Sequence, residues 1–243
     1  MTGAPRQLTL TLPVVERRGR EDWIVSACNR AASELVDRHP DWPSDVVVLC
    51  GPEGAGKSHL ARVFAEETGA TIVAAADLSI HDPLALAAAG PVVVEDAGPG
   101  LDERAFFHLL NAVRERGGRM LVTARSAPAT WDLAIADLAS RLRAATPVAM
   151  GEPDDELLEA LLAKLFADRQ TVVDPAVITY LARRMERSHA AAVGLVAALD
   201  RAALAAKGPI TRAIAARVLD EGFDGAPRLP GLDEEGGEGK NPS

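Results

Sequence analysis

The sequence is poor in cysteine, in aromatic residues and in long apolar runs. Cysteine accounts for 2 of the 243 residues, and aromatic residues make up 4%. Two cysteines cannot form a disulfide framework, which favours a reducing, cytoplasmic location. The longest apolar run covers 190–199, about half of the roughly 20 residues that a membrane-spanning helix needs. We therefore expect no membrane segment and no membrane partner.

Histidine and positive charge are also scarce. The 5 histidines have none of the spacings typical of a metal cage. The formal net charge is −9, which argues against a large nonspecific DNA-binding surface, because such surfaces work by neutralising phosphates. Composition therefore excludes several function classes but selects none.

Apolar runs alternate with helical patterns in the first part of the chain. Strands are expected at 46–49, 71–74, 92–94, 120–123 and 148–150, and helices at 22–38, 57–68, 81–89, 101–116 and 133–143. Beyond Gly151 only helices are expected, at 153–168, 174–187, 189–206 and 210–219. Strands that are apolar throughout and separated by helices predict a parallel sheet covered on both faces. The fold class is therefore α/β, followed by a small helical domain.

Four regions follow from this pattern. They are an N-terminal leader (1–20), an α/β nucleotide-binding domain (21–151), a helical domain (152–220) and an acidic tail (221–243). The tail is rich in glycine, proline and acidic residues, so we expect it to be disordered.

A phosphate-binding motif follows the first strand of the α/β region. The pattern G-x-x-x-x-G-K-[ST] is matched by Gly51, Pro52, Glu53, Gly54, Ala55, Gly56, Lys57 and Ser58. Its glycines let several backbone N–H groups face one anion at a helix N-terminus. Lys57 is expected to bind the β- and γ-phosphates of ATP or ADP, and Ser58 to ligate Mg²⁺. The alternative is a glycine-rich turn that carries Lys-Ser by chance.

Two acidic residues end the expected strand at 92–94. Glu95 is placed to face Mg²⁺, and Asp96 to orient or activate a water molecule. Aspartate is the common residue at the first position, and glutamate moves the carboxylate by one methylene. The motif therefore predicts nucleotide binding more strongly than efficient hydrolysis. The alternative is a pair of acids that only caps the strand before the turn at 98–100.

Together with the trailing helices, these motifs make the chain resemble the AAA+ ATPases. Within them it is similar to the DnaA/Hda branch, and specifically to the Hda (HdaA) regulators of replication initiation, over about residues 7–219. The resemblance rests on Gln7–Leu12, which is similar to a Q-L-x-L-x-L clamp-binding peptide, and on the Asn29–Ala32, Asp137–Leu142 and Leu199–Ala202 stretches. It implies a P-loop AAA+ domain with a small C-terminal helical lid.

The resemblance also implies partners and site residues. It assigns Gln7, Leu8, Leu10 and Leu12 to the DNA polymerase III sliding clamp, Asn29 to the nucleotide and Arg141 to an arginine finger that acts on a neighbouring subunit. The implied partners are the clamp and DnaA, with DNA contacted only through the clamp, and a homo-oligomer is possible. An edge strand at 7–12 and a salt bridge from Arg141 to Asp137 are the simpler interpretations.

Two positions depart from the family pattern. Arg125 stands where relatives place an acidic sensor 1 residue, and Ala190 stands at the sensor 2 arginine position. Loss of that arginine predicts slow self-hydrolysis. The leading hypothesis is a negative regulator of replication initiation that binds the loaded clamp and stimulates hydrolysis of DnaA-bound ATP in trans. The alternatives are a self-sufficient ATPase of clamp-loader type and a clamp-bound adaptor with a vestigial nucleotide pocket.

Overall fold

The computed structural model describes residues 19–223. The expected clamp-binding residues Gln7, Leu8, Leu10 and Leu12, and nearly all of the acidic tail, lie outside the described residues.

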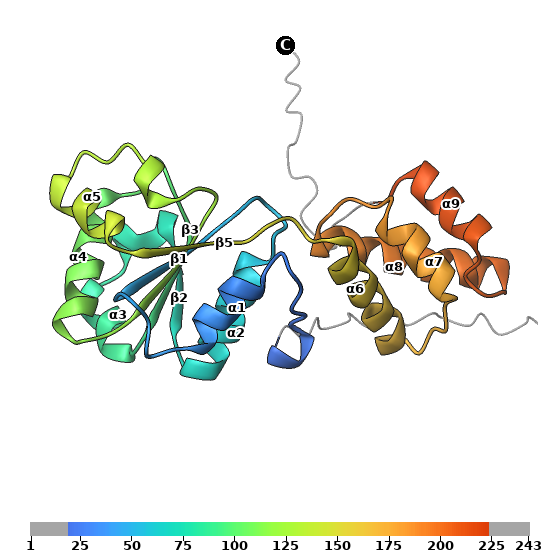
Figure 1. The fold of residues 1–243 in the computed structure, drawn as a ribbon, viewed down its shortest axis with the longest axis horizontal. Coiled ribbons are helices and arrows are strands. Elements are labelled where there is room, and N and C mark those ends of the chain that lie inside the picture. The colour runs from blue at the N-terminus through green and yellow to red at the C-terminus, as the bar shows by residue number, and fades with distance from the viewer. Residues whose placement is uncertain (1–18, 224–243) are drawn as a thin grey trace, which may run out of the picture.

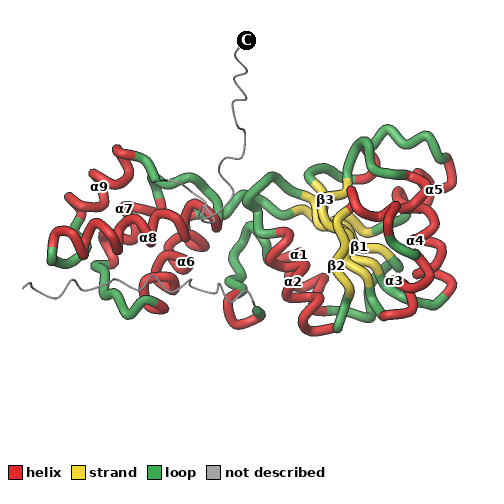
Figure 2. The backbone as a smooth tube through the Cα atoms, turned by 180° about the vertical axis from the view of Figure 1, so that it is seen from behind, coloured by secondary structure: helices red, strands yellow, loops and turns green. Residues whose placement is uncertain are grey.

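Five parallel strands form one sheet in the order β2-β3-β4-β1-β5. The strands are β1 (Val46–Cys50), β2 (Thr71–Ala74), β3 (Val92–Ala97), β4 (Met120–Ala124) and β5 (Thr146–Ala149). Strands β1 and β4 are buried along their whole length, as expected for a parallel sheet with helices on both faces. The parallel sheet predicted from the apolar runs is confirmed, and Figure 2 shows its strands in yellow between the helices.

Helices cover both faces of the sheet (Figure 1). On one face α1 (Arg30–Asp37) and α2 (Lys57–Thr68) pack against Val47 and Leu49. On the other, α3 (Pro83–Ala89), α4 (Glu103–Glu115) and α5 (Ala136–Arg143) pack against Val46 and Val48. Alternate residues of β1 thus enter two cores. Three 3₁₀ turns, at Arg20–Asp22, Ala75–Ile80 and Pro128–Thr130, complete this part of the chain.

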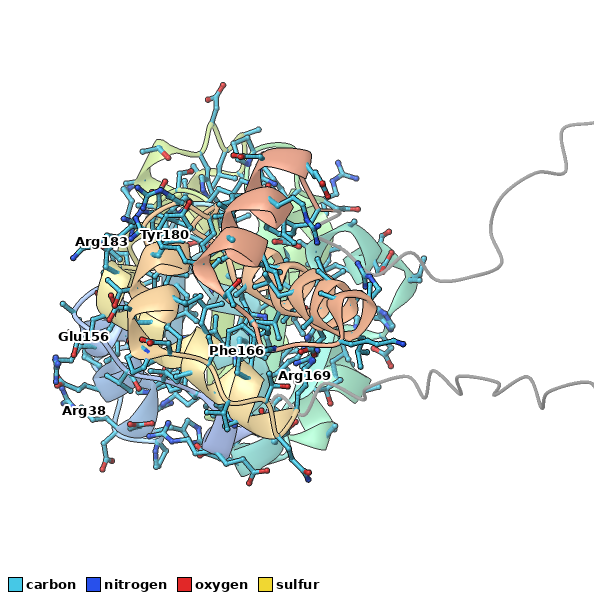
Figure 3. All side chains as sticks on the ribbon, turned by 90° about the vertical axis from the view of Figure 1, so that its right-hand side faces the viewer. Arg38, Glu156, Phe166, Arg169, Tyr180 and Arg183 are labelled. Carbon is cyan, nitrogen blue, oxygen red and sulfur yellow. The ribbon has the colours of Figure 1, made fainter. Side chains whose placement is uncertain are left out.

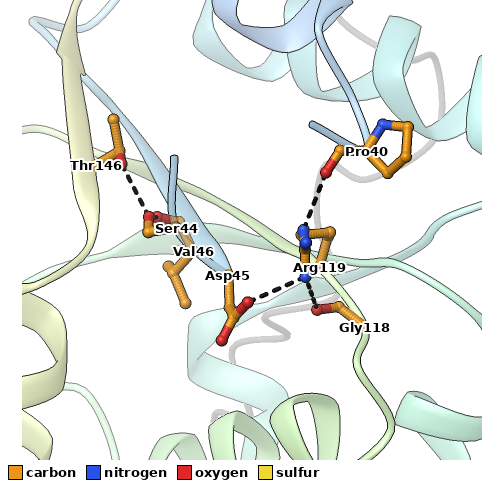
Figure 4. Close-up of polar contacts among 7 residues, drawn as sticks. All are labelled: Pro40, Ser44, Asp45, Val46, Gly118, Arg119 and Thr146. Atoms are coloured by element: carbon orange, nitrogen blue, oxygen red, sulfur yellow. Dashed lines mark hydrogen bonds and ion pairs between the residues drawn. The ribbon is translucent and has the colours of Figure 1, made fainter. Parts of the chain in front are cut away.

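Polar contacts fix the amino end of β1 (Figure 4). The Ser44 and Thr146 hydroxyl oxygens lie 2.8 Å apart, which ties the start of β1 to β5. Arg119 donates a hydrogen bond of 3.0 Å to Asp45 and one of 3.2 Å to the Pro40 carbonyl, which ties the same edge to the turn before β4. Because this end is held, the position of the loop that leaves the other end of β1 is set by the sheet.

Within residues 19–223 the chain ends in a helical region, called the lid below, formed by α6 (Asp155–Asp168), α7 (Pro175–Ala182), α8 (His189–Ala206) and α9 (Arg212–Glu221). Asp154, Asp174, Ser188 and Thr211 accept hydrogen bonds from backbone N–H groups at the four helix starts, which satisfies donors that a helix leaves unpaired. Figure 3 looks onto this part of the molecule, with Phe166 and Tyr180 labelled. By length and composition α8 would suffice to cross a membrane, but its apolar face packs into the lid core with α6 and α7.

The largest correction to the expected elements concerns the helix at 22–38. The structure has a helix only at Arg30–Asp37, and residues 23–29 form an irregular segment. The physical reason is local: the Asn29 amide oxygen accepts a 2.9 Å hydrogen bond from the Ser26 N–H, and its nitrogen donates one to the Ile24 carbonyl. Such side-chain bonds compete with helical ones. The expected helix 174–187 also ends earlier, at Ala182, and β5 lies at 146–149 instead of 148–150.

Candidate functional site

Glycines shape the loop between β1 and α2. A Cβ on Gly51 would lie 2.3 Å from the Met150 carbonyl oxygen, so no larger residue fits beside β5. Gly54 and Gly56 have φ values of +79° and +88°, in the left-handed region that favours glycine. Gly56 caps α2, whose first residue is Lys57. The loop therefore ends on the positive end of a helix, as an anion site requires.

Lys57 is held inside the loop. Its Nζ donates hydrogen bonds of 2.8 and 2.7 Å to the Gly51 and Pro52 carbonyls, and the residue is 8% exposed. Burial lowers the pKa of this amine, while the nearby carboxylate of Asp96 acts in the opposite direction. Ser58 follows on the first turn of α2. The predicted loop residues Gly51, Pro52, Glu53, Gly54, Ala55, Gly56, Lys57 and Ser58 thus form one continuous strand–turn–helix unit.

The two predicted acids lie at the carboxyl end of β3, where the register with β4 shifts. Asp96 has a positive φ of 57°, and its N–H donates a 2.9 Å hydrogen bond to the hydroxyl of buried Thr123 on β4. A bulge of this kind re-aims a side chain. Within residues 19–223, Glu95 Oε1 is buried and accepts no hydrogen bond, and a carboxylate oxygen is the kind of ligand that Mg²⁺ prefers; the same residues hold no cluster of three or more histidine, cysteine or acidic side chains that could bind a metal.

Asn29 lines the same cavity as Gly54, Ala55 and Gly56 of the phosphate loop. It is 1% exposed, and both ends of its amide are used by the Ser26 and Ile24 backbone. It therefore positions the 23–29 segment. That segment, with the loop and the lid, encloses this cavity, which sequence reasoning missed and which is lined among others by Trp23, Ile24, Gly56, His59, Leu157 and His189.

The cavity has aromatic walls and lies beside the phosphate loop. The Trp23 and His59 rings meet edge to face at 5.2 Å, and the His59 and His189 rings at 5.8 Å. Trp23 also lies beside Gly56, where a Cβ would come within 3.4 Å of the indole ring. An apolar, aromatic cleft next to an anion site suits a nucleoside base. The chain has only 3 tryptophans, and the presence of one of them, Trp23, ahead of the loop motif was the available indication of this cavity in the sequence.

The start of α8 touches the phosphate loop. A Cβ on Gly54 would lie 2.9 Å from the Ser188 Cβ. Ala190, at the expected sensor 2 position, is exposed. Of the neighbouring arginines, Arg187 bonds Asp155 and the Pro153 carbonyl, and Arg184 stacks over Tyr180 at 4.2 Å; Figure 3 labels Tyr180 and Arg183 within the lid.

Arg125 leaves β4 directly beside the phosphate loop. The Gly51 N–H donates a 3.2 Å hydrogen bond to the carbonyl of Ala124, the residue before Arg125. The guanidinium then pairs with Glu53 of the loop at 2.8 Å.

Arg141 lies near the amino end of β1, whereas the phosphate loop leaves the carboxyl end of that strand. It lines a surface pocket with Asp45 and Val46 at the start of β1, and five strand residues span about 17 Å at 3.3 Å each. Its guanidinium pairs with Asp137 at 2.9 Å, donates to Asn111 and lies 5.2 Å from the Phe107 ring. The salt bridge to Asp137 expected under the simpler interpretation is present.

Comparisons with solved structures define the fold. The chain superimposes on domain III of the Thermotoga maritima replication initiation protein DnaA with a TM-score of 0.70, at 14% identity over 86% of this chain and 98% of that one. A replication initiator DnaA bound to AMPPCP and single-stranded DNA gives 0.63, at 18% identity over 74% of this chain and 63% of that one. A Thermotoga maritima RuvB Holliday junction branch migration motor gives 0.58, at 15% identity over 80% and 65%. The chain has the AAA+ fold. It spans less than two thirds of the second and third of these proteins.

Comparisons of sequence are weaker. No family model matches. A tRNA dimethylallyltransferase from Cereibacter sphaeroides is 28% identical over 151 residues, 56% of this chain and 47% of that protein. One from Desulfosudis oleivorans is 42% identical over 52 residues, 21% of this chain and 17% of that protein. The chain therefore spans about half or less of the curated relatives that it matches.

Proposed function

We propose that the chain is an ATP- or ADP-binding AAA+ regulator of replication initiation. It binds the sliding clamp through Gln7, Leu8, Leu10 and Leu12, and it stimulates hydrolysis of ATP bound to DnaA in trans through Arg141. The observation that carries the proposal is the separation of its two cationic sites: Lys57 in its own loop, and Arg141 at the far edge of the sheet.

Nucleotide binding in this proposal follows from the loop and its neighbours. The loop N–H groups and Lys57 hold the phosphates, and the aromatic cavity with Trp23 and His59 takes the base. Ser58 and Glu95 hold Mg²⁺, which when bound neutralises phosphate charge. Asp96 orients a water molecule. A DnaA bound to AMPPCP is among the structures with this fold, which supports a nucleotide as the ligand.

Action in trans follows from the place of Arg141. A guanidinium at the edge remote from its own phosphate loop is available only to a second molecule, and a planar guanidinium is suited to a γ-phosphate. The side chain is 27% exposed and is held by an ion pair with Asp137, a hydrogen bond to Asn111 and the Phe107 ring, so a γ-phosphate of the partner has to replace these contacts. The fold shared with DnaA domain III supports a like domain as the partner.

The experiment is a single-turnover assay. DnaA loaded with labelled ATP, clamp loaded on DNA and this chain are mixed, and conversion to ADP is followed. Arg141→Ala and a leader variant with Leu8 and Leu10 changed to alanine are each expected to lose the stimulation, whereas Arg143→Ala, an exposed neighbour on α5, retains it. An unchanged rate with Arg141→Ala contradicts the proposal.

The same assay separates the alternatives. A self-sufficient ATPase of clamp-loader type would hydrolyse ATP briskly without DnaA and would lose that activity with Lys57→Ala. A clamp-bound adaptor would retain its function with Arg141→Ala and lose it with the leader variant. The absence of an arginine at Ala190 and the engagement of Arg187 by Asp155 count against the first alternative.

A further inference from the structure

Arg125 and the loop residue Glu53 meet at the rim of the phosphate loop. Arg125 Nη2 lies 2.8 Å from Glu53 Oε2, and the side chains are 76% and 81% exposed. We propose that Arg125 binds the terminal phosphate of a nucleoside triphosphate in this chain's own loop, and that Glu53 holds Arg125 until the triphosphate arrives. The inference rests on nucleotide binding by the loop but not on action in trans.

Backbone geometry places Arg125 at the phosphate end of the site. Strand β4 lies next to β1, with Cys50 paired to Ala124, and the Gly51 N–H is bonded to the Ala124 carbonyl. Arg125 therefore leaves the sheet beside the first residue of the loop. On its other side, Thr123 of β4 accepts a hydrogen bond from the Asp96 N–H. The side chain thus starts between the loop and the acidic end of β3.

Charge at the site supports the same assignment. Burial is the main cause that lowers the pKa of Lys57 and Asp96 opposes it; the charge of Arg125 is near enough to lower this pKa further, by a smaller effect. The lid offers little else: Ala190 carries no charge, Arg187 is bonded to Asp155, and Arg184 is stacked on Tyr180. Arg125, which is paired with Glu53 of the loop, is thus a second cation, besides Lys57, whose side chain contacts the phosphate loop itself.

The Arg125–Glu53 ion pair is weak enough for Arg125 to exchange Glu53 for a phosphate. An ion pair between two exposed side chains contributes about 0–1 kcal/mol. A terminal phosphate carries more charge than a carboxylate and accepts bidentate hydrogen bonds from a guanidinium. Arg125 therefore leaves Glu53 when a triphosphate is bound, whereas a diphosphate leaves the pair intact.

The test is equilibrium titration of the full-length chain with fluorescent ATP and ADP analogues in the presence of Mg²⁺. For Arg125→Ala we expect affinity for the triphosphate to fall about tenfold or more, as loss of a charge-assisted bond implies, and affinity for the diphosphate to change less than about threefold. Arg125→Lys is expected to lie between. Arg217→Ala, which removes an exposed ion pair with Glu221 in the lid, is the matched control and is expected to change neither affinity.

A double-mutant cycle tests the role of Glu53. Glu53→Gln is expected to tighten triphosphate binding by up to about fivefold, because Arg125 no longer has to leave a partner. In the Arg125→Ala background the same change is expected to have no effect. Equal losses for both nucleotides, or a Glu53→Gln effect that persists without Arg125, would overturn the proposal. These affinities do not depend on DnaA or the clamp, so their outcome is separate from that of the trans assay.

Discussion

Lys57 shows how one residue links folding to ligand binding. Its ammonium group is buried in the loop and held by two backbone carbonyls. These carbonyls compensate part of the cost of burying a charge. A bound phosphate offers a full negative charge in their place, so the loop is built around a cation whose best partner is a ligand.

The lowered pKa of Lys57 predicts how binding depends on pH. Burial favours the neutral amine, and a bound phosphate favours the charged one, so the pKa rises on binding. Below the pKa that Lys57 has in the nucleotide-free loop, the amine is charged with and without ADP. It then contributes no pH dependence to the affinity for ADP. Above that pKa, binding takes up a proton and the affinity for ADP falls with pH, by at most about tenfold per pH unit.

The measurement is ADP affinity between about pH 7 and pH 10. Lys57→Ala is expected to abolish tight binding together with the slope. Lys207→Ala, which removes an exposed lysine at the end of α8, is the control and is expected to retain both. An affinity that rises with pH in the wild-type chain would contradict this account of the loop.

Arg141 predicts a small effect on stability. Its ion pair with Asp137 is partly exposed, and such pairs contribute about 0–1 kcal/mol. Arg141→Ala is therefore expected to lower the free energy of unfolding by no more than about 1.5 kcal/mol, with the Asn111 bond included. Urea denaturation measures it, with Arg143→Ala as the control. A much larger loss would mean that Arg141 is mainly a structural residue.

At the scale of elements, the segment at 23–29 joins the α/β part of the molecule to the lid. Asp154, which caps α6, also accepts a 3.3 Å hydrogen bond from the Cys28 N–H, and the Gly151 N–H donates to the Cys28 carbonyl. The Lys164 ammonium on α6 pairs with Asp22 at 2.7 Å. Residues 22–29 therefore both line the cavity and hold α6 of the lid.

This arrangement makes Asn29 a positioning residue. Asn29→Ala leaves buried backbone groups at Ser26 and Ile24 without partners, at about 1–3 kcal/mol for each such group. We expect lower stability in urea and weaker nucleotide binding, because the wall that carries Trp23 loosens. Arg30→Ala, at the exposed next position, is the control. A variant of unchanged stability that binds nucleotide more weakly would instead indicate direct contact between Asn29 and the ligand.

The same elements show what sequence patterns can and cannot predict. Helix α2 and strands β1 and β4 were predictable because apolar periodicity and the loop motif coincide there. The 23–29 segment was mistaken for helix, since its apolar spacing is helical and only the buried amide of Asn29 diverts the backbone. The cavity lined by Trp23 and His59 was missed for another reason: its walls come from four separated stretches, and no local pattern unites them.

At the scale of the whole molecule, two sites face different ways. The phosphate loop opens between the sheet and the lid, while Arg141 lies on α5, on the other side of the sheet from α2 (Figure 1). In the proposed function, the cleft between the sheet and the lid binds a nucleotide while the surface around Arg141 meets a second molecule. Ser188, at the start of α8, lies against Gly54 of the phosphate loop. This contact couples the lid to the loop.

The most direct test of this account is the rate at which DnaA-bound ATP is converted to ADP in the presence of loaded clamp. We predict clear acceleration by the wild-type chain, and a rate near that of DnaA alone with Arg141→Ala. Nucleotide affinity of the variant is expected to remain that of the wild type, and its free energy of unfolding to fall by no more than about 1.5 kcal/mol. Acceleration that survives the loss of Arg141, or none with the wild-type chain, would contradict the account.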